Sequence, residues 1–152
     1  MSPSEKMIHN LATDKSASAN LHVCFGGFSS AGIKSENQDA FAAIAPPSPV
    51  MIGKGAIAAI ADGVSSASMA AQAAQLSVTQ FIDEYYATPE MWSTKKSAAK
   101  VLTSLNQWLF TQSSSLYNQS PQWLTTFSAI ILKSATGYIF HVGDTRISRY
   151  RQ

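Results

Sequence analysis

The sequence has 152 residues, of which 45% are hydrophobic and only 13% are charged, and its formal net charge is +2 at neutral pH. This length suits one domain with a real core, and the scattered cationic residues exclude the dense basic surface of a protein that binds nucleic acid or anionic membranes. No apolar run approaches the ~20 residues that span a bilayer, so neither nucleic acid nor a membrane is an expected partner.

The first 20 residues are polar and lack the apolar core of a signal peptide. We therefore expect a flexible lead-in over 1–20 and a domain over 21–152. The single cysteine, Cys24, excludes a disulfide framework and lies in an apolar run, where a small core residue is expected. A reducing, cytoplasmic location fits this cysteine usage.

The first predicted elements are strands. Residues 21–25 and 40–44 are apolar and partly β-branched, and a proline-rich segment at 46–49 ends the second run. Residues 56–61 form a short apolar run between glycines, which favours a buried strand.

Two helices are predicted next, because the apolar period changes to three and four residues. They cover 67–86 and 94–112, and Ser93 is the expected N-cap of the second. A polar loop is expected over 111–121. The predicted inward-facing residues are Ala70, Ala74, Val78, Phe81, Ile82 and Tyr85 on the first helix, and Ala98, Val101, Leu102, Leu105, Trp108 and Leu109 on the second.

Three more strands are predicted after the helices, over 126–132, 138–142 and 147–150. Residues 134–137 are typical of a hairpin turn, with Gly137 able to take a positive φ. Strands on both sides of two long helices do not follow strict βαβ alternation. The order therefore indicates an α+β fold with antiparallel sheet.

Three acidic residues stand beside these strands, namely Asp39, Asp62 and Asp144. Carboxylates aimed at one point from rigid strand ends need a cation between them, and oxygen ligands suit Mg²⁺ or Mn²⁺. A metal pair that polarises a phosphoryl group is the natural use of such a site. Each residue alone also has a plainer interpretation, since Asp62-Gly63 is a frequent turn dipeptide and Asp144 has Arg146 as a local partner.

Two other polar residues have simple expected roles. Lys34 is either a surface residue or a point charge that meets a phosphate. His141 directly precedes an apolar strand residue, where a packed, hydrogen-bonded histidine is expected rather than a metal ligand.

Together, in this order and spacing, the motifs resemble the metal-dependent Ser/Thr protein phosphatases, the type 2C or PPM family, in their bacterial form. The resemblance spans residues 23–150. It rests on GIKSENQDAF at 32–41, ADGV at 61–64, TT at 125–126 and HVGDTR at 141–146.

The resemblance implies a β-sandwich of two antiparallel sheets with helices packed outside, and a two-metal cleft at one end. Asp62 would bridge two Mn²⁺ or Mg²⁺ ions, the Gly63 carbonyl would bind one of them, and Asp39 would ligate directly or through water. Asp144 would serve a third metal site. The implied substrates are phosphorylated proteins, hydrolysed by metal-activated water. Lys34 replaces the family's phosphate-gripping Arg, whose planar fork it lacks, so a weaker grip is expected.

The chain departs from the family in one further respect. Two more metal-binding Asp residues of the family have no counterpart, because the other aspartates, Asp14 and Asp83, lie in the lead-in and on a helix. We therefore expect an incomplete domain, namely a truncated phosphatase with weak metal binding and impaired activity. The alternative is a non-catalytic domain that acts in protein binding or self-association through exposed sheet edges.

Overall fold

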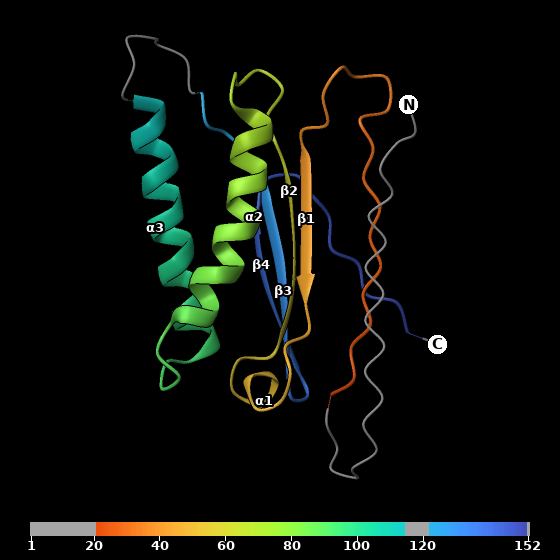
Figure 1. The fold of residues 1–152 in the computed structure, drawn as a ribbon, viewed down its shortest axis with the longest axis vertical. Helices are drawn as coiled ribbons and strands as arrows, with labels where there is room; N and C mark the ends of the chain where they lie inside the picture. Colours follow the sequence, from red (N-terminus) through yellow and green to blue (C-terminus); the bar gives the residue numbers. More distant parts are fainter. Residues whose placement is uncertain (1–20, 115–121, 152) are drawn as a thin grey trace.

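The computed structural model describes residues 21–114 and 122–151. The predicted lead-in over 1–20 and most of the predicted loop over 111–121 lie outside the described residues. In chain order the elements are β1 (Asp39–Ile44), α1 (Val50–Lys54), β2 (Ala56–Asp62), α2 (Ala70–Ala87), α3 (Thr94–Ser114), β3 (Phe127–Lys133) and β4 (Thr136–Val142) (Figure 1).

The four strands form one antiparallel sheet in the order β1-β2-β3-β4, which confirms the α+β class. Helix α2 lies across β1 and β2, and α3 packs beside α2 towards β4, so both long helices cover the same face (Figure 1). The resemblance implied a sandwich of two sheets. The described residues contain this single sheet.

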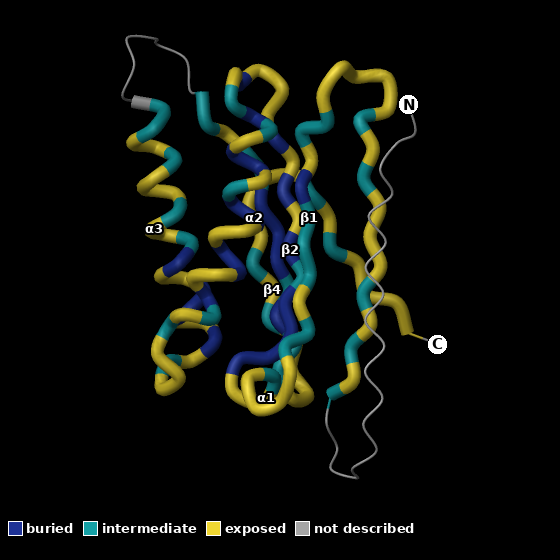
Figure 2. The backbone as a smooth tube through the Cα atoms, viewed as in Figure 1, coloured by how far each residue is buried: buried dark blue, intermediate teal, exposed yellow. Residues whose placement is uncertain are grey.

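Successive residues of each strand point to opposite faces of the sheet, and residues paired directly across strands share a face. The pairing therefore assigns every strand residue to one of two faces. The helix-covered face carries small and aliphatic residues that are buried against α2 (Figure 2). Its residues include Ala40, Ala42, Ile57, Ala59, Ala61, Phe127, Ala129 and Ile131. The opposite face, which we call the open face, carries Asp39, Phe41, Ala43, Ala58, Ile60, Asp62, Ser128, Ile130, Ile139 and His141.

The two long helices were predicted well. Every predicted inward-facing residue of α2 is buried, and the Ser93 hydroxyl accepts a hydrogen bond from the Lys96 N–H at 3.2 Å, as an N-cap does. Along α3 the burial declines, from Ala98 at 0% exposed to Trp108 at 40%. The helix therefore packs mainly through its first half. In the described residues, no helix has both the length and the apolarity to cross a bilayer.

Helix α1 was not predicted, and it carries a buried lysine that ties it to the end of α2. The Lys54 ammonium donates hydrogen bonds to the Thr88 carbonyl and hydroxyl at 2.6 and 2.7 Å. The Tyr85 hydroxyl donates back to the Lys54 carbonyl at 2.9 Å. Burial lowers the pKa of Lys54. These bonds tie α1 to Thr88, the C-cap of α2, and so fix that end of the helix to the segment before β2.

Four local predictions were wrong. Residues 21–25 and 147–150 are not strands, because they lack the ladder of backbone hydrogen bonds that a strand needs. Cys24 is exposed for the same reason. In the β3–β4 hairpin the positive φ is taken by Ser134, at 52°, whereas Gly137 pairs with Leu132 inside the strand.

The contact of β2 with α2 yields a stability prediction at Gly63, directly after β2. A Cβ at this position would overlap the carbonyl group of Ala70 in the first turn of α2. We expect Gly63→Ala to lower the free energy of unfolding by about 1–3 kcal/mol, because helix and strand must separate. Urea unfolding followed by circular dichroism measures this change.

The matched control is Gly26→Ala, where an added Cβ meets nothing within 4 Å. Equal unfolding midpoints for Gly63→Ala and the control would show that α2 does not depend on this close approach.

Candidate active site

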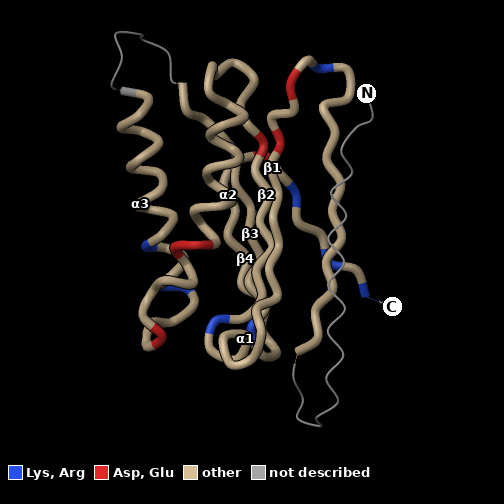
Figure 3. The backbone as a smooth tube through the Cα atoms, viewed as in Figure 1, with Lys and Arg blue, Asp and Glu red and all other residues tan. Residues whose placement is uncertain are grey.

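Two carboxylates face each other across the first two strands. Antiparallel pairing places Asp39 of β1 directly opposite Asp62 of β2. Both residues are exposed on the open face and lie at the same end of the sheet, since β1 begins at Asp39 and β2 ends at Asp62. Figure 3 shows acidic residues in red at this end of the two strands. Two like charges at directly opposite positions destabilise a sheet, so packing within the sheet does not account for this pair.

Asp62 is held by its backbone through the two threonines that precede β3. The Asp62 N–H donates to the Thr126 hydroxyl at 2.9 Å, and the Thr126 N–H donates to the Asp62 carbonyl at 2.8 Å. The Thr125 hydroxyl donates to the same carbonyl at 3.0 Å. The backbone of Asp62 is thus fixed on both sides, and its side chain is directed onto the open face.

Asp39 is held by the turn that precedes β1. Its N–H donates to the Asn37 side-chain oxygen at 3.0 Å, and the Asn37 amide donates to the Ser29 hydroxyl at 2.7 Å. The second bond ties the segment before the turn to the site. Gly63 is placed beside β1 because its N–H donates to the Gln38 carbonyl at 3.0 Å.

The structure brings the predicted phosphate contact, Lys34, to the same end of the sheet. Its ammonium donates to the Ser65 hydroxyl at 3.3 Å, and Ser65 donates to the Gln38 side chain at 3.0 Å. Gly32 permits the tight turn before it, with a φ of 60°. The positive charge of Lys34 lowers the pKa of Asp62 in part, so the two groups are within electrostatic reach.

The fourth predicted residue, Asp144, lies in the turn that follows β4. It is exposed and close enough for its charge to help raise the pKa of Asp62. It does not join the pair as a ligand cluster, since the described residues contain no group of three or more acidic, histidine or cysteine side chains positioned around one metal. The predicted site is therefore assembled as a close pair with Lys34 and Asp144 nearby.

The electrostatic balance of the site is negative. Partial burial raises the pKa of Asp62, and the charge of Asp39 and a hydrogen bond between the two carboxyl groups raise it further. Lys34 offsets this only in part. Asp62 therefore holds a proton more readily than an ordinary aspartate does, because its surroundings are short of positive charge.

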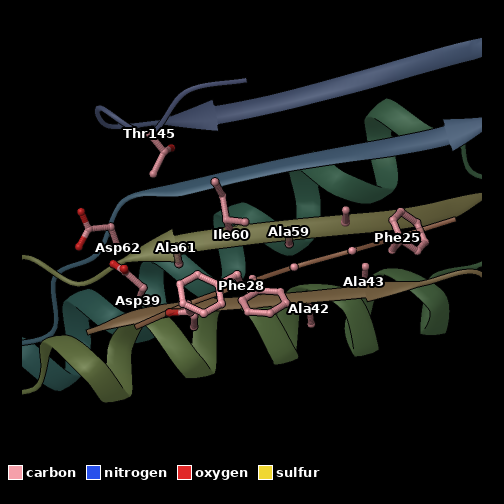
Figure 4. Close-up of a pocket in the computed structure, with 16 residues that line it drawn as sticks. Phe25, Phe28, Asp39, Ala42, Ala43, Ala59, Ile60, Ala61, Asp62 and Thr145 are labelled. Atoms are coloured by element: carbon pink, nitrogen blue, oxygen red, sulfur yellow. The ribbon is translucent and has the colours of Figure 1, made fainter. Parts of the chain in front are cut away.

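An apolar pocket of about 400 Å³ extends from the carboxylates along the open face. Its floor is formed by β1 and β2, and residues 25–29 cover it from above. A Cβ at Gly27 would overlap the ring of Phe41, so this segment lies directly on the sheet. Figure 4 shows Asp39, Asp62 and Thr145 at one end of the pocket and Phe25 towards the other.

The residues present fit a hard divalent cation. Asp39 and Asp62 supply carboxylate oxygens from rigid strands, and their mutual repulsion is relieved by a cation between them. The Gly63 carbonyl and Asp144 are the nearest further oxygen donors that the sequence predicted. Mg²⁺ and Mn²⁺ prefer such oxygen ligands.

Sequence reasoning did not find the pocket lining or the contacts of the last turn. Phe25 and Phe28 line the pocket, although the sequence indicated only a strand over 21–25 and made no prediction for Phe28. Thr145 also lines it and bonds to Ser128 at 2.5 Å. His141 is hydrogen-bonded as predicted, to the Ser128 hydroxyl at 2.7 Å.

Repulsion between the two carboxylates should lower the stability of the fold, so removing one of the charges should stabilise the protein. We expect Asp39→Asn to raise the free energy of unfolding of the metal-free protein by up to ~1 kcal/mol at neutral pH, because a like-charge cross-strand pair is removed. The pKa of Asp62 is raised in the fold, so the repulsion is lost as the pH falls through that raised pKa. The gain should therefore shrink in acid.

Thermal unfolding across neutral and acidic pH checks this expectation, with Asp83→Asn on the exposed surface of α2 as the control. A loss of stability in Asp39→Asn at neutral pH would contradict the repulsion described here.

Comparison with known proteins places this geometry in a family. A family model described as protein phosphatase 2C matches residues 27–152. Neither the curated proteins nor the solved structures gave a match. The matched range includes every strand of the sheet, the carboxylate pair and the turn that carries Asp144. The chain belongs to the protein phosphatase 2C family.

Proposed function

We propose that this chain is a metal-dependent protein serine/threonine phosphatase that hydrolyses phosphomonoesters on protein side chains. The observation that carries the proposal is the register of β1 and β2, which sets Asp39 opposite Asp62 beside Lys34. In a chain of the protein phosphatase 2C family, two carboxylates and a cation at one strand end are suited to phosphate chemistry.

Each residue has a separate part in this proposal. Asp62 and Asp39 would hold Mn²⁺ or Mg²⁺, with the Gly63 carbonyl and Asp144 as further oxygen donors. We expect two bound ions and a third site. A bound divalent ion would supply Lewis-acid polarisation of a phosphoryl oxygen and would make a nucleophile available from water at neutral pH. The chain then needs no nucleophilic side chain of its own.

Lys34 is the group that would meet the phosphate. Its hydrogen bond to Ser65 holds the ammonium near the carboxylates, where a dianionic phosphate needs positive charge. Lys offers one point charge where Arg would offer a planar fork, so phosphate should be bound with less orientation. The proposed substrates are phosphorylated proteins, whose phosphoserine or phosphothreonine side chains reach an exposed site.

The proposed activity is slow. Of the three carboxylates proposed to hold the metal, Asp39 and Asp62 are hydrogen-bonded to each other, whereas Asp144 acts on Asp62 only through its charge. The described residues contain no cluster of three such ligands. Mg²⁺ gives up its water reluctantly when protein ligands are few, so metal binding should be weak. Mn²⁺ in excess is therefore the better ion for the test.

The test measures hydrolysis of p-nitrophenyl phosphate and of a phosphoserine peptide with Mn²⁺ in excess. We expect a slow, Mn²⁺-dependent turnover that falls at least ~100-fold in Asp62→Asn, because a carboxylate that would hold the metal is lost. Calorimetric titration with Mn²⁺ should lose its binding signal in the same variant.

Asp83→Asn is the control, since Asp83 lies on α2 away from the site. Turnover or Mn²⁺ binding that is equal in the wild type and Asp62→Asn would refute the proposed site.

A second candidate function is supported by the open face. Ile60 and Ile139 lie on it with 40% and 57% of their surface exposed, and no helix covers them. Large uncovered apolar surface is uncommon on monomers, and the low content of charged residues offers little repulsion between copies. Self-association through this face and the sheet edges would make the chain a binding module rather than an enzyme.

Light scattering at several protein concentrations tests the second candidate. We expect a mass that rises with concentration for the wild type, and a monomer for Ile139→Asp, because a buried charge opposes association. Ile52→Asp in α1 is the matched control, since Ile52 is also exposed, at 61%. A monomeric wild type at every concentration would eliminate this candidate.

A further inference from the structure

A buried serine on the open face has no role in the site described above. Ser128 of β3 lies directly opposite His141 of β4 and opposite Ile60 of β2. On the open face, Ser128 and its paired residues lie directly beside the pair of carboxylates, because Ile60 is two residues before Asp62 in β2. Only 1% of Ser128 is exposed, and one of its two cross-strand neighbours, Ile60, is apolar. A buried hydroxyl is costly unless it is hydrogen-bonded, so its partners need an explanation.

Ser128 has two partners, one on each side. Its hydroxyl is 2.7 Å from Nδ1 of His141 and 2.5 Å from the hydroxyl of Thr145. A hydroxyl has one proton, so the three groups form a chain with one direction. When Nδ1 of His141 accepts, Ser128 donates to it and Thr145 donates to Ser128. When Nδ1 carries the proton, both bonds reverse. In either direction the bond to His141 holds the Ser128 hydroxyl in place beside Thr145.

The turn that carries Asp144 is fixed at two points. At the first, Gly143 has a φ of 101°, and a Cβ there would come within 2.7 Å of the Thr126 side chain. Thr126 is the residue that binds the backbone of Asp62 on both sides. At the second, Thr145 is bonded to Ser128. Asp144 lies between these two anchors.

We propose that Ser128, seated by His141, is a positioning residue that through the Thr145 hydroxyl holds Asp144 at the carboxylate end of the pocket. Thr145 lines the same pocket end as Asp62, so the anchor and the site are adjacent (Figure 4). The inference deepens the proposed function, because Asp144 is one of the oxygen donors assigned there to the metal.

The first test uses the metal-free protein and does not depend on activity. Backbone ¹⁵N relaxation of residues 143–146 should give order parameters of about 0.85 in the wild type and below about 0.6 in Thr145→Val and Ser128→Ala. Thr145→Ser keeps the hydroxyl and should keep the turn ordered. Ser128→Ala removes no apolar volume, and exposed His141 can bond to water instead, so the fold should persist.

The second test is calorimetric affinity for Mn²⁺. We expect Thr145→Val to weaken binding about tenfold and Thr145→Ser to restore it, as for residues that orient a metal ligand. In an Asp144→Asn background the Thr145→Val substitution should have no further effect, because no carboxylate remains to be positioned.

A turn that stays ordered in Thr145→Val overturns the inference. If the wild type binds Mn²⁺, a Thr145→Val variant with a loosened turn but the same Mn²⁺ affinity also overturns it. A wild type that binds no Mn²⁺ contradicts the proposed function instead. In that case the relaxation data alone decide the inference. It is supported if the turn loosens in Thr145→Val and in Ser128→Ala but stays ordered in Thr145→Ser.

Discussion

The site depends on the register of β1 against β2. Pairing Asp39 with Asp62 puts both carboxylates on the open face, and a shift of one residue would send one of them to the helix-covered face. The register is enforced from the other side of the sheet, where small residues of both strands are buried against α2. Packing that excludes water on one face therefore sets the spacing of charges on the other.

Small residues make this arrangement possible. Alanines on β1, β2 and the first half of α2 let the helix approach the sheet closely, and Gly63 lets the first turn of α2 touch the end of β2. At the far end, buried Lys54 ties α1 to Thr88, the C-cap of α2. The helix is thus fixed at both ends, which leaves the strand ends rigid enough to hold two repelling carboxylates.

The open face has two regions with different chemistry. Towards the carboxylates it is polar, with Lys34, Asp144 and the chain from His141 to Thr145 around the pair. Away from them it is apolar, from the pocket beneath Phe25 to exposed Ile139. The first region suits phosphate chemistry in a protein phosphatase 2C chain, and the second suits contact with another apolar surface.

The sequence by itself determined the α+β class, four of the strands and both long helices, because apolar periods of two and of three to four residues survive in any packing. It also pointed to Asp39, Asp62 and Asp144, whose spacing carries the family resemblance. It did not determine which segments pair, so 21–25 and 147–150 looked like strands, although strands exist only where a neighbour supplies hydrogen bonds. Only the tertiary structure decided that Asp39 opposes Asp62, and that Ser128 bonds to Thr145. Those relations join residues far apart in the chain, and packing between elements sets them.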